Sequence, residues 1–183
     1  RGAFVGFDRV TGGRVDDPQK VSTIMAFLEA GHADKLLVSS DFTELPQGLP
    51  PVIRQLASSV TGEAPSRFEK AVALQDFFRR NFEYSLDRAP AGSGTDELVT
   101  FLSTGPDGRI GYCEQFAAAM AVMARQLGIP ARVAVGFLYP DEVAPGVFEY
   151  SAHDLHSWPE LFIAGAGWVR FEPPPGQRAD QGA

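Results

Sequence analysis

The single cysteine of the chain, Cys113, follows Gly111 and Tyr112 and begins a run of residues with helical periodicity. At a helix start, unpaired backbone N–H groups and the positive end of the dipole favour a thiolate, the reactive form of cysteine. The first residue of a helix that follows a glycine is usually accessible. Because free cysteines are also among the most buried residues, a purely structural Cys113 is the competing interpretation. Cys113 is therefore a candidate nucleophile.

A nucleophilic thiol needs a base within hydrogen-bond reach, and the chain has three histidines. His32 follows a glycine at the end of a predicted helix, where a protonated imidazole would simply complement the helix dipole. His156 begins a predicted strand on which polar and aromatic residues alternate along one face, a mixture that favours a cleft. His153 precedes the regular strand and is the weaker choice. We expect His156 to be the base, with an ordinary structural histidine as the alternative.

A third candidate catalytic residue, a carboxylate beside the base, follows from the predicted hairpin whose turn is 164–167. If the hairpin is centred on residue 164, His156 lies opposite Glu172 and Trp158 lies opposite Arg170. Directly opposed residues have Cβ atoms about 4.5–5.5 Å apart, so a carboxylate at that position can reach an imidazole nitrogen. The alternative is an ordinary carboxylate at the end of a strand, because a one-residue shift would separate the two faces.

Other residues near these three are candidates for the substrate cleft. Tyr84 follows a predicted helix and is a candidate for lining the cleft or for donating to an oxyanion, although an aromatic residue there is more often part of a core. Tyr112 and Trp158 are cleft candidates beside the expected nucleophile and base. Asp154 and Glu160 flank the expected base and are candidates for tuning it, or else solvated strand residues.

Helices are predicted before the cysteine and strands after it, which indicates the α+β class. The strongest helix signal is the capping box Ser66–Glu69. The predicted helices are 17–31, 50–62, 66–82, 98–102 and 113–127, and the predicted strands are 131–139, 155–163 and 168–172, with a short edge strand at 4–7.

Four segments follow one another in the order of a known set of motifs. They are Gly111–Ala117 (GYCEQFA), Leu127–Val133 (LGIPARV), His156–Glu160 (HSWPE) and Gly167–Pro173 (GWVRFEP). These resemble the cysteine box, the helix-to-strand passage, the histidine box and the acidic box of the transglutaminase-like superfamily, which belongs with the papain-like cysteine enzymes. The resemblance implies that Cys113 is the nucleophile, His156 the base and Glu172 the orienting acid.

The resemblance also implies an architecture, namely a papain-like transglutaminase core with helices packed on an antiparallel sheet and the nucleophile at a helix N-terminus. It covers residues 64–176, which we expect to be the catalytic core. Residues 1–63 are expected to form a helical N-terminal annex, and residues 177–183 a linker or tail.

Two positions depart from the commoner family pattern. The acidic residue is more often aspartate, whereas here it is Glu172, and animal members follow the cysteine with tryptophan, whereas here Glu114 follows it. Many bacterial members share the second feature and resemble extracytoplasmic domains of multi-pass membrane proteins. The resemblance therefore implies an extracytoplasmic domain of a bacterial membrane protein, with a cytoplasmic location as the alternative.

Composition excludes several classes of function. The 183 residues include 16 Lys and Arg against 23 Asp and Glu, a net charge of −7, which disfavours a nucleic-acid partner. One cysteine permits no internal disulfide, and with three histidines it cannot form a repeated zinc motif. No run of about 18 apolar residues is present, so we expect no direct membrane insertion by this segment. The sequence implies neither a cofactor nor a metal.

The function predicted from these residues is cysteine-dependent acyl transfer on a carboxamide or peptide through a thioester. The acceptor is an amine or water, and the partner is a peptide or protein substrate. The alternatives are a cysteine peptidase of the same fold and a non-catalytic domain that binds peptides or assists assembly. The sequence determines neither the substrate nor the oligomeric state.

Overall fold

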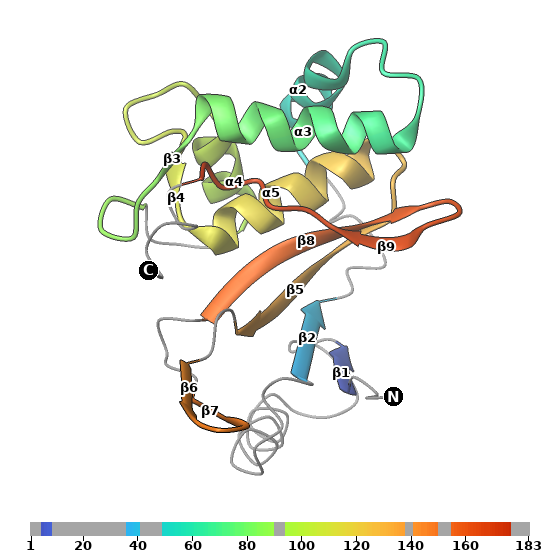
Figure 1. Ribbon diagram of the computed structural model, residues 1–183. Helices are drawn as coiled ribbons and strands as arrows, with labels where there is room; N and C mark the ends of the chain where they lie inside the picture. Colours follow the sequence, from blue (N-terminus) through green and yellow to red (C-terminus); the bar gives the residue numbers. More distant parts are fainter. Residues whose placement is uncertain are drawn as a thin grey trace. The chain divides into compact units, whose positions relative to one another are not determined.

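The structure, a computed structural model, describes residues 5–8, 36–40, 49–89, 94–137, 141–149 and 155–176. The chain divides into two units, which consist of Arg1–Phe42 with Val133–Ser157 and of Thr43–Arg132 with Trp158–Ala183. Figure 1 shows the described elements. We call these the first and the second unit.

The second unit contains four described helices, which are α2 (Pro51–Thr61), α3 (Arg67–Asn81), α4 (Thr95–Leu102) and α5 (Cys113–Gln126). Each lies where the sequence predicts a helix. The capping box at the start of α3 is confirmed, since Glu69 N–H donates to Ser66 Oγ (3.2 Å) and Ser66 N–H donates to Glu69 Oε2 (3.1 Å). The predicted helix at 17–31 lies outside the described residues.

Helix α5 is packed against α2, α3 and α4 (Figure 1). Its small buried residues, among them Ala117, Ala119 and Ala124, let the neighbouring helices approach closely. Phenylalanine rings fill the space toward α3 and α4, with ring centroids 6.0 Å apart for Phe78 and Phe116 and 5.2 Å apart for Phe101 and Phe116. This aromatic core fixes the direction of α5 and thus the position of its first turn.

A two-stranded parallel sheet lies beside the start of α5. It pairs β3 (Glu83–Tyr84) with β4 (Ile110–Gly111), and Tyr84 lies opposite Gly111. Neither strand could be predicted from the sequence, because two residues are too few to show an alternating pattern. The pair brings the segment after α3 next to the residues that precede Cys113.

The predicted hairpin is confirmed as β8 (Leu155–Ile163) and β9 (Gly167–Arg170), but its register differs from the prediction. Arg170 pairs with Glu160 and Gly167 with Ile163, so the centre is residue 165 and the predicted pairing of Trp158 with Arg170 is wrong. The turn has positive φ at Gly165 and Gly167, and this places its centre one residue later than predicted.

The observed register changes which residue lies opposite Glu172. Phe171 N–H donates to Pro159 O (3.0 Å), one residue past the end of β9, and the same register extended by one more residue sets Glu172 against Trp158 rather than His156. The prediction that Glu172 lies directly opposite His156 depended on the wrong centre, so that geometric argument no longer applies. The expectation that a one-residue shift would separate the two faces is also wrong, because a shift of the centre by one residue moves the pairing by two and leaves the alternation of faces unchanged.

The remaining strands are β1 (Val5–Asp8), β2 (Leu36–Ser40), β5 (Ala131–Phe137), β6 (Asp141–Ala144) and β7 (Val147–Glu149). The order of the five-stranded sheet is β1-β2-β5-β8-β9. In the first unit, β1 is parallel to β2, β2 is antiparallel to β5, and β6 and β7 form a separate hairpin.

The short edge strand expected at 4–7 is confirmed as β1, whereas β2, β6 and β7 were not predicted. Helices followed by mainly antiparallel strands confirm the α+β class. Among the described residues, no helix is both long and apolar enough to span a membrane.

Candidate active site

Cys113 is the first residue of α5, as predicted. The turn around it is held by its neighbours, since the Tyr112 N–H donates to Gln115 Oε1 (3.0 Å) and the Phe116 N–H to Tyr112 O (3.3 Å). Cys113 is only 8% exposed, so the expectation of an accessible thiol at the helix start is wrong. The residues before α5 form β4, which is paired with β3, and not the free glycine loop that the expectation assumed.

Gly111 is required by the packing next to the cysteine. A Cβ at this position would lie 2.8 Å from Phe101 Cε2 and 3.2 Å from Gln115 Cβ. The Phe101 ring belongs to the aromatic core and is 2% exposed, so it has little room to move. The glycine in the cysteine box therefore permits β4 to lie close to α4 and α5.

We expect Gly111→Ala to lower the free energy of unfolding by about 1–3 kcal/mol, the usual cost of overpacking a filled core. Urea unfolding of the full chain measures this difference. Gly176→Ala is the matched control, because a Cβ there would have no atom within 4 Å, and its midpoint should not change. An equally small effect at both glycines would contradict the packing argument.

Two tyrosines accompany Cys113 at this end of α5. The Tyr112 hydroxyl donates to Glu114 Oε2 (3.0 Å). Burial, followed by this hydrogen bond and the negative charge of Glu114, raises the pKa of Tyr112, and smaller electrostatic contributions come from Cys113 and Tyr84. Tyr112 thus keeps its hydroxyl proton at neutral pH. The structure brings Cys113, Tyr84 and Tyr112 into one neighbourhood within the second unit.

Tyr84 is half-buried, and its ring stacks on Phe116 with centroids 6.3 Å apart. Its strand places it opposite Gly111, two residues before Cys113. Part of the tyrosine therefore packs on the aromatic core, and its backbone lies next to the cysteine box. Its role in a cleft or as an oxyanion donor stays a prediction.

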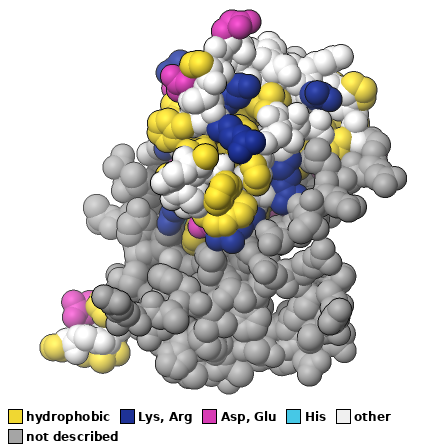
Figure 2. Space-filling view, turned by 90° about the vertical axis from the view of Figure 1, so that its right-hand side faces the viewer, with side chains coloured by type: hydrophobic (Ala, Val, Ile, Leu, Met, Phe, Trp, Pro, Cys, Tyr) yellow, Lys and Arg dark blue, Asp and Glu magenta, His cyan; other side chains and the backbone are white. Residues whose placement is uncertain are grey.

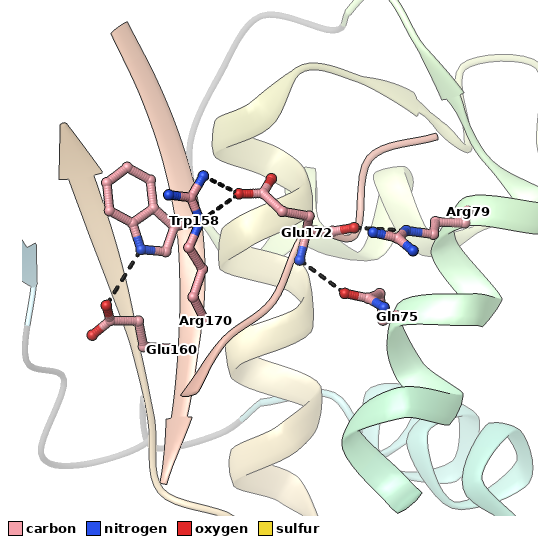
Figure 3. A network of polar contacts seen from close by, with 6 residues as sticks. All are labelled: Gln75, Arg79, Trp158, Glu160, Arg170 and Glu172. Carbon is pink, nitrogen blue, oxygen red and sulfur yellow. Dashed lines mark hydrogen bonds and ion pairs between the residues drawn. The ribbon is translucent and has the colours of Figure 1, made fainter. Parts of the chain in front are cut away.

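The backbone of Glu172 is attached to α3 on both sides of the residue (Figure 3). Glu172 N–H donates to Gln75 Oε1 (2.9 Å), and Arg79 Nε donates to Glu172 O (2.8 Å). The Glu172 side chain accepts hydrogen bonds from Arg170. Neither Gln75 nor Arg79 was predicted from the sequence as a partner of Glu172. Gln75 stands at a core-facing position of a helix, where a polar residue indicates a specific partner.

Trp158 is 8% exposed, and its indole Nε1–H donates to Glu160 Oε1 (3.3 Å). The other oxygen of Glu160 accepts from Arg132 Nε (2.7 Å), and the guanidinium of Arg170 covers the indole ring. Glu160 is therefore a partly buried ion-pair member rather than a solvated strand residue.

On the face of the second unit seen in Figure 2, dark blue Lys and Arg side chains lie among yellow hydrophobic ones.

His156 is the second residue of β8 and is 3% exposed. It belongs to the first unit, whereas Cys113 and Glu172 belong to the second. His32, His153 and Asp154 lie outside the described residues. The assignment of His156 as the base therefore stays a prediction. In the described ranges, no three His, Cys, Asp or Glu side chains come together as a metal site would require.

The family model of the transglutaminase-like superfamily matches residues 54–173, more than half of the chain. The chain therefore belongs to this superfamily, and the resemblance seen in the sequence is confirmed. The match includes Cys113, His156 and Glu172.

Two of the curated relatives come from bacteria. The Bacillus subtilis protein YebA is 30% identical over 79% of this chain and 20% of its own length. A protein-glutamine gamma-glutamyltransferase of Pseudomonas aeruginosa is 34% identical over 71% of this chain and 19% of its own length. The chain thus spans about one fifth of the curated relatives that it matches.

Among solved structures, the periplasmic domain of TgpA from Pseudomonas aeruginosa matches with a TM-score of 0.60 and 31% identity, over 71% of this chain and 44% of that one. A protein from Cytophaga hutchinsonii matches with a TM-score of 0.50 and 22% identity, over 73% of this chain and 44% of that one. The second likeness shows the fold alone. Together they confirm the transglutaminase-like fold.

Proposed function

We propose that this chain is the catalytic part of a cysteine-dependent acyl-transfer enzyme, and that Cys113 attacks a carboxamide or peptide carbonyl. The observation that carries the proposal is the position of the single cysteine, which is the first residue of α5 within the segment that matches the superfamily. A helix N-terminus favours the thiolate, and the aromatic core behind α5 fixes where that thiolate lies.

In the proposed reaction, Cys113 Sγ adds to the carbonyl carbon, and the oxygen becomes an oxyanion next to the Cys113 N–H. Collapse of this intermediate breaks the carbon–nitrogen bond. His156 gives the proton that it took from the thiol to the leaving ammonia or amine, so a thioester remains. Water or an amine then attacks the thioester, and His156 accepts its proton while the thiolate leaves. Glu172 is proposed to orient the imidazole and stabilise its charged form.

The second oxyanion donor is proposed to be a tyrosine hydroxyl. Tyr112 lies next to Cys113 in the chain, and its raised pKa keeps the hydroxyl protonated over the working pH range. A protonated hydroxyl can donate a hydrogen bond to the developing negative charge, whereas a tyrosinate cannot. In this proposal the single hydroxyl hydrogen of Tyr112 turns from Glu114 Oε2 to the oxyanion as the charge develops. Tyr84, opposite Gly111, is the alternative donor.

The proposed acyl donor is a glutamine side chain of a peptide or protein. The name of the Pseudomonas aeruginosa relative, a protein-glutamine gamma-glutamyltransferase, supports this substrate class. The similar periplasmic domain supports the proposal that this chain is an extracytoplasmic part of a bacterial membrane protein. We propose residues 64–176 as the catalytic core, with 1–63 as an annex and 177–183 as a tail.

Mass spectrometry after incubation with a glutamine peptide, with and without a primary amine, tests the proposal. We expect a product in which the amine has replaced ammonia, or, with water as acceptor, the deamidated peptide. Cleavage of the peptide would instead indicate the peptidase alternative. Cys113→Ala should abolish every product and every thioester adduct, because the nucleophile is removed.

Tyr112→Phe is the second variant, and a loss of rate with an unchanged thioester mass would support the oxyanion role of the hydroxyl. Product formation by the Cys113→Ala variant would contradict the proposal. Peptide binding by the parent chain with no product and no adduct would favour the non-catalytic alternative.

A further inference from the structure

One guanidinium group in the second unit connects Glu172 with the indole of Trp158 (Figure 3). Arg170 Nε donates to Glu172 Oε1 (2.7 Å), and Arg170 Nη2 donates to the same oxygen. The Arg170 Cζ atom also lies 4.2 Å from the centre of the Trp158 ring. Cation–π contact and two charge-assisted hydrogen bonds thus act on the same side chain and limit its rotamers.

The Trp158 ring, on which the Arg170 guanidinium lies, is itself held in place. The indole Nε1–H of Trp158 donates to Glu160, and Glu160 forms an ion pair with Arg132, which lies on the neighbouring strand β5. Glu160 is also the residue directly opposite Arg170 in the hairpin. Because Trp158 is buried and held at its edge, the ring gives Arg170 a defined plane on which to lie.

The backbone of Glu172 is fixed independently by α3, through Gln75 at its N–H and Arg79 at its carbonyl oxygen. What remains variable is the side chain, and a glutamate has one more rotatable bond than an aspartate. A carboxylate that must orient an imidazole needs those rotations restricted. The two hydrogen bonds from Arg170 provide that restriction.

The ion pair between Arg170 and Glu172 is not explained by its contribution to the stability of the fold. The Arg170 and Glu172 side chains are 42% and 34% exposed, and ion pairs at this degree of exposure contribute little to the free energy of folding. Their geometry is nevertheless more constrained than that of an ordinary surface pair, since Trp158 and α3 hold both partners. The arrangement fits a requirement for orientation.

We propose that Arg170 is a positioning residue, which holds the Glu172 carboxylate in the orientation that acyl transfer requires. This inference rests on the proposed function, because it assigns Arg170 a role only through Glu172. Arg170 is not proposed to contact the substrate or the reacting atoms. Its effect on the rate should therefore depend on the presence of a carboxylate at position 172.

A double-mutant cycle on the full chain tests this dependence. The variants are Arg170→Met, Glu172→Gln and the combination, and the measurement is kcat and KM for a glutamine peptide. We expect Arg170→Met to lower kcat by about three- to tenfold in the parent chain, and by less than about twofold in the Glu172→Gln background. KM should change little, because Arg170 does not bind the substrate.

Arg170→Lys keeps the charge but not the fork of donors, so we expect it to restore part of kcat. If Arg170→Met fails to fold, the same cycle with the lysine variant replaces it, and its loss of kcat should likewise vanish in the Glu172→Gln background. Arg88→Met is the matched control, because Arg88 forms an exposed ion pair with Glu83 (2.6 Å), and kcat should stay at the parent value.

Equal rate losses in both backgrounds, or a change in KM alone, would overturn the role assigned to Arg170 and leave the proposed function intact. Absence of acyl transfer by the parent chain would instead overturn the proposed function together with this inference. The two failures are therefore distinguishable in one set of measurements.

Discussion

Replacing His156 by alanine is expected to lower kcat for acyl transfer by about 10²- to 10⁴-fold, the usual contribution of general acid–base catalysis. In the proposed reaction the imidazole accepts the thiol proton and later protonates the leaving amine, so its loss affects both steps. Steady-state kinetics with a glutamine peptide and a primary amine measures the effect. His153→Ala is the matched control and should keep most of the activity.

Because His156 is 3% exposed, the alanine variant must be distinguished from an unfolded chain. His156→Gln keeps a polar side chain of similar size but cannot cycle a proton, so it should show the same loss of kcat with a parent-like thermal unfolding midpoint. If His153→Ala loses activity and His156→Ala keeps it, the base is His153. If neither variant loses activity, neither His153 nor His156 is the base.

Elements with a strong local signal could be predicted from the sequence. Helix α3 begins at a capping box and α5 begins at Cys113, both as predicted. The bounds of β8, Leu155–Ile163, agree with the prediction because alternation and the following glycine turn define that strand locally. The strand pairs β3–β4 and β6–β7 consist of two to four residues each, too short for a periodic pattern.

The register of the hairpin shows where local reasoning fails. The composition of the turn indicated where the chain reverses, but the centre depends on which glycines adopt positive φ, and these are Gly165 and Gly167. An error of one residue in the centre changed the partner of Arg170 from Trp158 to Glu160. Residues on one face could be predicted, whereas the individual pairs could not.

The support of Glu172 depends on contacts between distant parts of the sequence. Gln75 and Arg79 precede Glu172 by more than ninety positions, and only the packing of the last segment along α3 brings them together. Gln75 carried a partial signal, as a polar residue on a core-facing stripe. The family resemblance identified Glu172 itself, but neither the motif nor the hairpin indicated that α3 holds its backbone.

Replacing Glu172 by glutamine is expected to slow acylation of Cys113 by at least about tenfold, with little change in folding. An ionised carboxylate that accepts from one imidazole nitrogen selects the tautomer whose other nitrogen faces the thiol, and it stabilises the imidazolium. Glutamine keeps the shape and loses the charge. A charge-assisted hydrogen bond contributes about 1.5–3 kcal/mol, which should appear mainly in the activation barrier.

Single-turnover mass spectrometry of the thioester measures the acylation rate, and urea unfolding measures stability. Asp76→Asn is the matched control, because Asp76 forms an exposed ion pair with Arg80 (2.9 Å) on α3 and should acylate at the parent rate. Glu172→Asp should retain appreciable activity, since the charge remains and the fixed backbone keeps the shorter carboxylate in the same region.

The comparison of the two Glu172 variants separates charge from shape. If Glu172→Gln acylates at the parent rate, Glu172 is an ordinary carboxylate at the end of a strand, and the orienting group must be sought at Asp154. If both variants lose activity equally, the length of the side chain matters as much as its charge. Because Arg170 can still approach a shorter carboxylate but gains no ion pair with an amide, we expect the aspartate variant to be the faster of the two.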